Sequence, residues 1–196
     1  MALLVYILIM SLILEIYKNS KTVFKLADIS MLFLNVETKY LSDRIGYYVQ
    51  TGKLLNPRKG IYAKPDYNPL ELANVLFTPS YISLEYVLQK SGVIFQYDSR
   101  ITCVSYLSRD IEADGGIYSY RRIKEEIIID NTGIVRTGDN TNIAIPERAF
   151  LDMLYLNKDF YFDNLLPLNR ELVYKILPVY KSAALEKRVK KYFRNG

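Results

Sequence analysis

The chain of 196 residues has no histidine, no tryptophan and only one cysteine, Cys103. Without imidazole, the Ser-His-Asp and Cys-His schemes of nucleophilic catalysis are excluded, and so are zinc fingers and zinc hydrolases. A single cysteine cannot form an intramolecular disulfide, which predicts a protein of the reducing cytoplasm. The sequence also lacks a GxxxxGK loop, a GxGxxG loop and an internal repeat. Chemistry is left to carboxylates, Lys, Arg, Tyr and hydroxyl groups, and no cofactor is expected.

Charge is unevenly distributed along the chain. Residues 1–63 carry eight Lys or Arg and four Asp or Glu, residues 64–169 carry ten and fifteen, and residues 170–196 carry eight and two. The three segments therefore have net charges of +4, −5 and +6, in agreement with the +5 of the whole chain. Two basic ends around an acidic middle favour one or two surfaces for a polyanion. The simpler interpretation of the basic C-terminal segment is a solvated helix face.

The first 14 residues, MALLVYILIMSLIL, are apolar almost throughout. Neither a preceding basic residue nor a following small-x-small cleavage site accompanies them, and the run is shorter than the roughly 20 residues of a membrane span. We therefore expect a buried first helix over residues 3–17, with Leu8, Leu12 and Ile16 on one face, and no membrane association. A dimer surface, a start site placed too early and a membrane anchor remain alternatives.

Two more helices and a hairpin are expected next. Residues 23–34 have apolar side chains at helical spacing, and residues 36–54 place Leu41, Ile45, Tyr48 and Val49 on one face. Gly52 suits the end of that helix. Residues 54–63 then form a hairpin with a basic tip, Asn56-Pro57-Arg58-Lys59-Gly60. Three helices followed by such a hairpin are the order of a winged helix-turn-helix domain, which we assign to residues 1–64.

A winged helix binds DNA by inserting its third helix into the major groove while the hairpin reaches the phosphates. Side chains on the outer side of the third helix would read the base edges, and basic side chains would position the domain. The alternative is a protein-docking module in which Arg44 pairs with a carboxylate. The candidate DNA-binding residues are Lys39, Ser42, Asp43, Arg44, Tyr47, Arg58 and Lys59.

The pattern of expected helices and strands in residues 65–196 predicts a second domain, of the α+β class, with helices packed on a mostly antiparallel sheet. Helices are expected over 69–77, over 81–90 and, beginning at Pro146, over 147–156, with two more near the C-terminus. Strands are expected over 93–97, 101–107 and 123–129, and Asp114-Gly115-Gly116 indicates a hairpin turn.

Two groups of side chains in this domain are candidates for an effector surface. Arg148 lies on the ERAFLD helix, where Asp152 at i+4 also allows a local ion pair. The last helix is amphipathic and has a basic outer face that could contact DNA flanks, RNA or an acidic protein. The basic residues of that face are Lys187, Arg188, Lys190 and Lys191.

Residues 52–109 and 142–165 carry a family resemblance. PSYISLEYVLQKSG at 79–92 together with ERAFLD at 147–152 is its most specific part. In these segments the chain resembles the AbiEi family, the antitoxins and transcriptional regulators of AbiE abortive-infection, or type IV toxin-antitoxin, systems. One departure is Lys25, which stands where relatives commonly open the second helix with Thr or Ser, so that a side-chain cap is expected to be missing.

The resemblance implies a non-enzymatic, cytoplasmic protein that represses its own operon in phage defence. Its partners would be double-stranded operator DNA and, without a lasting complex, a nucleotidyltransferase toxin. Two alternatives remain: a module that binds a partner protein directly, and, ranked last, a metal-dependent nuclease using Asp152, Asp159 and Asp163.

Overall fold

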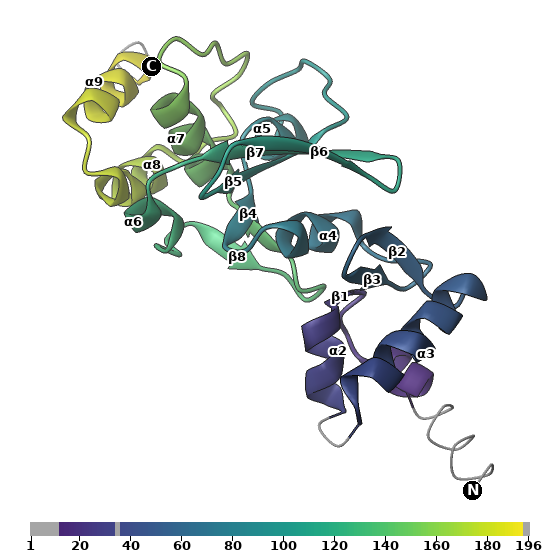
Figure 1. Ribbon diagram of the computed structural model, residues 1–196. Helices are drawn as coiled ribbons and strands as arrows, with labels where there is room; N and C mark the ends of the chain where they lie inside the picture. The colour runs from purple at the N-terminus through teal and green to yellow at the C-terminus, as the bar shows by residue number, and fades with distance from the viewer. Residues whose placement is uncertain (1–11, 34–35, 194–196) are drawn as a thin grey trace, which may run out of the picture. The chain divides into compact units, whose positions relative to one another are not determined.

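The computed structural model describes residues 12–33 and 36–193, which form two compact units, Met1–Leu76 and Phe77–Gly196 (Figure 1). The expected α+β class is confirmed. The boundary lies after Leu76 and not after Lys64, because the helix that follows the hairpin packs with the first unit.

Unit 1, Met1–Leu76, combines helices with a small antiparallel sheet of strand order β1-β3-β2. Residues 12–18 are helical, and the expected position of Leu8 lies outside the described residues. The hairpin is confirmed, and Val23–Lys25 adds a strand that the sequence did not predict. The elements in order are β1 (Val23–Lys25), α2 (Leu26–Leu32), α3 (Thr38–Gln50), β2 (Leu55–Arg58), β3 (Ile61–Ala63) and α4 (Pro69–Leu76).

An apolar cluster packs the described part of the first helix, α2, α3 and the sheet of unit 1 together. Leu12 and Ile16 of the first helix and Leu41, Ile45 and Tyr48 of α3 are buried in it, as their spacing predicted. Burying such side chains is the main favourable contribution to folding. The cluster consists of Leu12, Ile16, Phe24, Ile29, Leu41, Ile45, Tyr48 and Leu54.

Helix ends in unit 1 follow local chemistry. Lys25 gives α2 no side-chain cap, as expected, but the carboxylate of Asp28 accepts a hydrogen bond from the Lys25 backbone N–H at 3.1 Å. This contact binds one amide at the start of the helix and places negative charge in its first turn. At the end of α3, Gly52 has a φ of +69°, the left-handed conformation for which glycine was expected there.

A buried carboxylate ties helix α4 to Thr22, the residue directly before β1. Glu71 is 2% exposed and accepts hydrogen bonds from the backbone N–H of Thr22 at 2.8 Å and from its hydroxyl at 2.5 Å. The Thr22 hydroxyl oxygen in turn accepts a hydrogen bond from the Asn68 N–H at 3.0 Å. A buried carboxylate needs such partners, and here both lie in unit 1.

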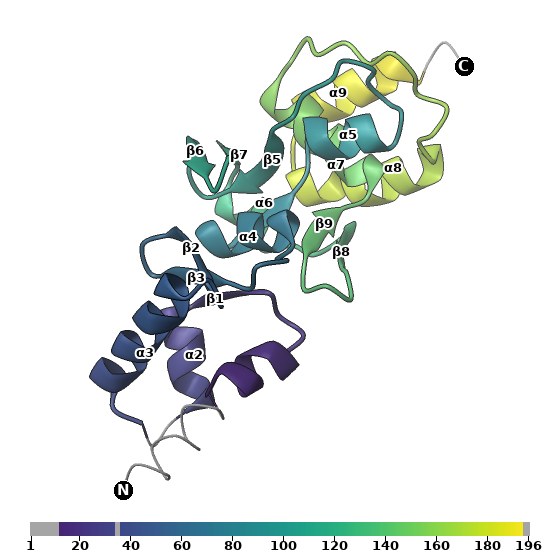
Figure 2. The same cartoon turned by 90° about the vertical axis from the view of Figure 1, so that its right-hand side faces the viewer.

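Unit 2 is built on a six-stranded sheet of order β6-β7-β5-β4-β9-β8. Helix α7 packs against α5, α8 and α9 (Figure 2). The helix expected to begin at Pro146 is confirmed, with the proline in its first turn. The elements are β4 (Ser80–Ile82), α5 (Glu85–Lys90), β5 (Ile101–Ser105), β6 (Arg109–Ala113), β7 (Gly116–Arg122), α6 (Glu125–Ile128), β8 (Ile134–Arg136), β9 (Asn142–Ala144), α7 (Pro146–Leu156), α8 (Arg170–Ile176), η1 (Leu177–Tyr180) and α9 (Ala183–Tyr192).

The sheet is mixed. Strands β5 and β7, and strands β4 and β9, pair in parallel, whereas β4–β5, β6–β7 and β8–β9 are antiparallel. The expected hairpin at Asp114-Gly115-Gly116 is confirmed as the β6–β7 turn. The expectation of a mostly antiparallel sheet missed the two parallel pairs, since parallel partners meet through long connections that local turn residues do not reveal.

Three local predictions in unit 2 are wrong. Residues 81–90 are not one helix, because Ser80–Ile82 pairs as β4 with both β5 and β9, and Leu84 has a φ of +59°. Residues 93–97 are not a strand, and the Val93 carbonyl instead accepts the N–H groups of residues 163 and 164, each at 3.1 Å. Residues 123–129 are not a strand, because Glu125–Ile128 forms α6, in which the N–H groups of Ile127 and Ile128 donate to the Lys124 carbonyl at 3.0 and 3.1 Å.

Candidate nucleic-acid interface

Helix α3 buries one face and exposes the other. Leu41, Ile45 and Tyr48 are at most 1% exposed, so the side chains between them point outward. This arrangement follows from apolar residues spaced three and four apart on a helix of 13 residues. Of the predicted base-reading residues, Lys39, Ser42, Asp43 and Tyr47 are exposed and Arg44 is half-buried.

Arg44 forms no ion pair among the described residues. Its guanidinium carbon instead lies 5.3 Å from the centre of the Tyr40 ring, a cation–π distance. Burial raises the pKa of Tyr48, and the Arg44 charge opposes that rise. The alternative in which Arg44 is neutralised by a carboxylate is therefore not supported, and its charge remains available near the exposed face of α3.

The hairpin presents the second group of predicted residues. Arg58 ends β2, Lys59 occupies the turn, and both are exposed. The Asn56 side-chain amide donates hydrogen bonds to the carbonyls of Arg58 at 2.9 Å and Ile61 at 2.7 Å. Gly60, with a φ of +80°, closes the turn. These contacts hold the basic tip in one conformation before any ligand arrives.

The hairpin and α3 are joined by a short, bonded connection. The backbone N–H groups of Lys53 and Leu54 donate to the Tyr48 carbonyl at 2.8 and 3.1 Å. The Gly60 carbonyl accepts the N–H of Leu26 at 3.2 Å, which fixes the tip against the start of α2. Unit 1 thus holds all seven predicted DNA-binding residues on two neighbouring, ordered elements.

The predicted effector residues separate into two environments. Lys187, Lys190 and Lys191 on α9 are exposed and Arg188 is half-buried, as the amphipathic pattern predicted. Arg148 on α7 is 0% exposed, so its assignment to an effector surface is wrong. The reason is that α7 is surrounded by other elements on several sides, which an i, i+4 pair cannot reveal.

Arg148 belongs to a buried polar network with Asp152. The Arg148 Nε lies 3.5 Å from Asp152 Oδ1, which confirms the predicted local ion pair. Asp152 also accepts hydrogen bonds from the hydroxyls of Ser83 at 2.7 Å, Tyr81 at 3.1 Å and Tyr180 at 2.6 Å. Burial raises the pKa of Asp152, and Arg148 opposes that rise. The sequence missed the three hydroxyl partners because they come from distant segments.

The guanidinium of Arg148 also binds the backbone. Its Nη1 donates to the Thr132 carbonyl at 2.9 Å, and its Nη2 donates to the Ile127 carbonyl at 2.8 Å and to the Tyr81 hydroxyl at 3.1 Å. These bonds connect α7 with α6, with the turn that follows α6, and with β4. The network is a structural core of unit 2.

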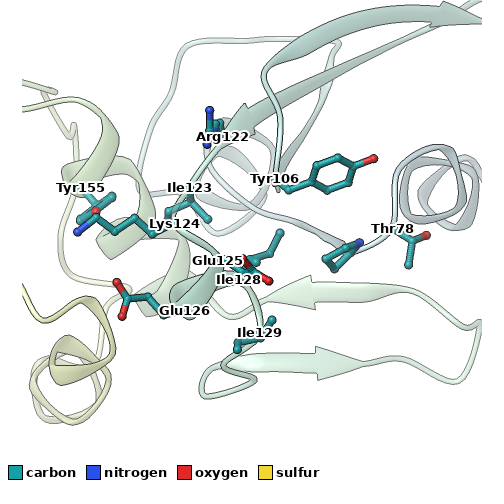
Figure 3. A pocket seen from close by; sticks show the side chains of 11 residues that line it. Thr78, Tyr106, Arg122, Ile123, Lys124, Glu125, Glu126, Ile128, Ile129 and Tyr155 are labelled. Carbon is teal, nitrogen blue, oxygen red and sulfur yellow. The ribbon is translucent and has the colours of Figure 1, made fainter.

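A cavity of about 1170 Å³ opens on unit 2. Lys124, Glu126 and Tyr155 lie toward one end of it, and Tyr106 and Thr78 toward the other (Figure 3). None of the predicted site residues lines this cavity. Its two cations, Arg122 and Lys124, are matched by two carboxylates, so it has no net preference for an anion.

A smaller groove of about 510 Å³ lies beside α9. It brings together three of the predicted effector residues, Lys187, Arg188 and Lys191, and leaves Lys190 outside. Lys190 is instead paired with Glu186 at 2.5 Å. The groove also includes the segment 158–161, whose involvement the sequence did not indicate.

The carboxylates proposed for a nuclease are not brought together as a metal site. Asp152 is buried in the network above, and the Asp163 carboxylate accepts the Phe95 N–H at 2.8 Å. In residues 12–33 and 36–193, no three Asp, Glu or Cys side chains are placed to hold a metal ion. Over the same residues, no helix combines the length and apolar character of a membrane span.

Comparison with protein-family models and with curated proteins finds no match for this chain.

Proposed function

We propose that the protein is a DNA-binding autorepressor and antitoxin of the type the sequence resembles, with unit 1 acting as a winged helix. The observation that carries the proposal is the exposed polar face of α3, followed directly by an ordered hairpin with Arg58 and Lys59 at its tip. A helix of this kind fits the major groove of B-DNA, and a basic hairpin beside it reaches phosphates. The opposite face of α3 is buried, so only one face is available to a ligand.

The mechanism we propose separates affinity from specificity. Lys39, Arg44, Arg58 and Lys59 neutralise phosphates, which orients the domain on the duplex. Ser42, Asp43 and Tyr47 then contact base edges, where hydroxyl and carboxylate groups distinguish donors from acceptors. Binding over the promoter of the protein's own operon blocks transcription. Unit 2 would oppose a nucleotidyltransferase toxin without forming a lasting complex, in the cytoplasm.

The test is fluorescence anisotropy with duplex DNA from directly upstream of the gene and a scrambled duplex. Four phosphate contacts predict a log–log salt slope of about −3.6, so affinity should fall about a hundredfold between 50 and 200 mM salt. Arg58→Ala/Lys59→Ala should weaken binding by about tenfold or more. Equal, salt-insensitive binding to both duplexes would overturn the proposal.

A matched control removes two charges elsewhere in unit 1. Lys18 pairs with Glu15 at 3.0 Å and Lys21 with Asp28 at 3.9 Å, and neither lies on α3 or the hairpin. Lys18→Ala/Lys21→Ala should therefore change operator affinity by less than about threefold. If both double variants weaken binding equally, net charge and not the hairpin accounts for the affinity.

One observation favours the second candidate, a module that docks a partner protein through unit 1. Met31 and Leu32 on α2 are 71% and 45% exposed, and a shallow cavity of about 490 Å³ lies along the same helix. Exposed apolar side chains around a groove are typical of protein contacts. Met31→Lys separates the candidates: it should abolish partner binding in a pull-down with the neighbouring gene product, and leave operator binding unchanged.

A further inference from the structure

The groove beside α9 has a strongly one-sided charge. Four of its lining residues are cationic, Lys158, Lys187, Arg188 and Lys191, against one carboxylate, Asp159. None of the four forms an ion pair within the described part of the chain. By contrast, Lys190 on the same helix is neutralised by Glu186. The cations of this groove are therefore available to an anionic ligand.

An exposed aromatic side chain lines the same groove. Tyr161 lines the groove and is 77% exposed, so one face of its ring is open to a planar partner. An exposed aromatic ring beside lysines and an arginine is the combination that proteins use to stack an unpaired base while binding its phosphates.

The groove is held in shape by packing beneath it. The Tyr192 hydroxyl donates a hydrogen bond to the Phe160 carbonyl, which fixes the segment 158–161 onto α9. The rings of Phe160, Phe162 and Tyr192 pack in sequence, with centroids 5.0 Å and 5.4 Å apart. A preformed site of this kind loses little conformational entropy when a ligand binds.

We propose that this groove binds single-stranded nucleic acid, with the phosphates on Lys187, Arg188 and Lys191 and an unpaired base on Tyr161. A volume of about 510 Å³ is in the range of small-ligand sites and accommodates one nucleotide of a strand. A duplex is excluded from this mode because its bases are paired and stacked. The proposal does not depend on DNA binding by unit 1. RNA and DNA share the required chemistry.

The experiment uses the full chain and three fluorescent probes: octauridylate, octadeoxyuridylate and a duplex hairpin of equal charge. Anisotropy is measured between 50 and 200 mM salt. In the Arg58→Ala/Lys59→Ala background, which removes duplex binding by unit 1, both single strands, or one of them, should bind more tightly than the duplex probe, with a salt slope of about −2 for three phosphates. A preference for octauridylate identifies RNA as the ligand, and the opposite preference identifies DNA. Failure of both single strands to bind would overturn the proposal.

The variants come with a charge-matched control. Lys187→Gln/Lys191→Gln should weaken binding by about tenfold or more. Lys181→Gln/Lys190→Gln removes the same charge from two lysines that are paired with Glu126 and Glu186 and lie outside the groove, and should have an effect of less than about twofold. Equal losses from both pairs would show that net charge alone binds the strand.

Two further variants test the geometry. Tyr161→Ala should weaken binding by about tenfold, because it removes the ring on which the unpaired base stacks, whereas Tyr161→Phe should retain the affinity. Asp159→Asn removes the one repelling carboxylate of the groove and should tighten binding a few-fold. An unchanged affinity for Tyr161→Ala would overturn the stacking mode. Thermal unfolding of each variant verifies that the fold is retained.

The operator variant separates this proposal from the proposed function. Arg58→Ala/Lys59→Ala should lose operator duplex binding and keep the affinity for the single strand. If Arg58→Ala/Lys59→Ala weakens single-strand binding and Lys187→Gln/Lys191→Gln does not, the strand is held by unit 1 and the groove proposal fails.

Discussion

At the scale of the residue, Arg148 shows how far a side chain's role depends on its surroundings. The residue is completely buried, and its guanidinium is bound by two backbone carbonyls, the Tyr81 hydroxyl and the Asp152 carboxylate. Removing one member of a buried charge pair leaves the other uncompensated. Arg148→Met should therefore cost about 3–5 kcal/mol in the free energy of unfolding, measured by urea denaturation.

An exposed ion pair provides the control for that prediction. Lys181 and Glu126 lie 3.7 Å apart with side chains 75% and 54% exposed. Lys181→Met should change stability by less than about 1 kcal/mol. Comparable losses in both variants would show that the buried pair has no special role.

The same network predicts a pH dependence. Burial raises the pKa of Asp152, and removal of the opposing Arg148 raises it further. A raised pKa means that the folded state binds the proton more tightly than the unfolded state, so stability is gained as pH falls through that pKa. The free energy of unfolding that Arg148→Met loses relative to the wild type should be smaller near about pH 5 than near about pH 8. A deficit that is constant with pH would contradict a buried, uncompensated carboxylate.

Gly133 is a second residue whose identity the tertiary structure requires. Its φ is +77°, and a Cβ placed there would lie 2.9 Å from Ile176 Cδ1 and 3.0 Å from Arg148 Cβ. Gly133→Ala should lower the free energy of unfolding by about 2–4 kcal/mol, because the cost of backbone strain and the cost of overpacking add together. Gly52→Ala, with a φ of +69° but open space around it, should cost only about 1 kcal/mol. Thermal unfolding of the two variants compares them directly, and equal costs would argue against crowding at Gly133.

At the scale of the element, the contact between α4 and β1 decides where unit 1 ends. Glu71 is the buried acceptor for both the N–H and the hydroxyl of Thr22. Glu71→Ala leaves that backbone N–H without its partner and should destabilise unit 1 by about 2–4 kcal/mol. Hydrogen exchange of the full chain should show faster exchange in residues 23–25 and 69–76. An equal increase throughout unit 2 would contradict the assignment of α4 to unit 1.

Elements with strong local signals were predictable, and elements defined by distant partners were not. The buried stripe of α3, the hairpin turns at Gly60 and Gly115 and the proline start of α7 follow from spacing and turn residues. Tyr81 and Ile82 favour strands, but a run of three residues beside the helical pattern of 85–90 is too short to be recognised, and two distant strands that pair with it define it as a strand.

At the scale of the whole molecule, each of the two units contains one of the proposed nucleic-acid-binding sites. All seven candidate DNA-binding residues lie in unit 1, and the basic groove lies in unit 2. Arg58→Ala/Lys59→Ala therefore changes unit 1, and Lys187→Gln/Lys191→Gln changes unit 2 of the same chain. Their effects on the duplex and on the single strand should be independent, because the altered sites share no residue.

The sequence by itself determined the α+β class, the polar face of α3, the basic hairpin and the amphipathic basic character of α9. Each of these depends on residues that are close in the chain, where helical and turn periodicities act directly. Only the tertiary structure decided that Arg148 is buried, that the sheet is mixed and that the segment 158–161 meets α9 in a basic groove. These features join residues far apart in the chain, and their energies come from packing and pairing that no local pattern records.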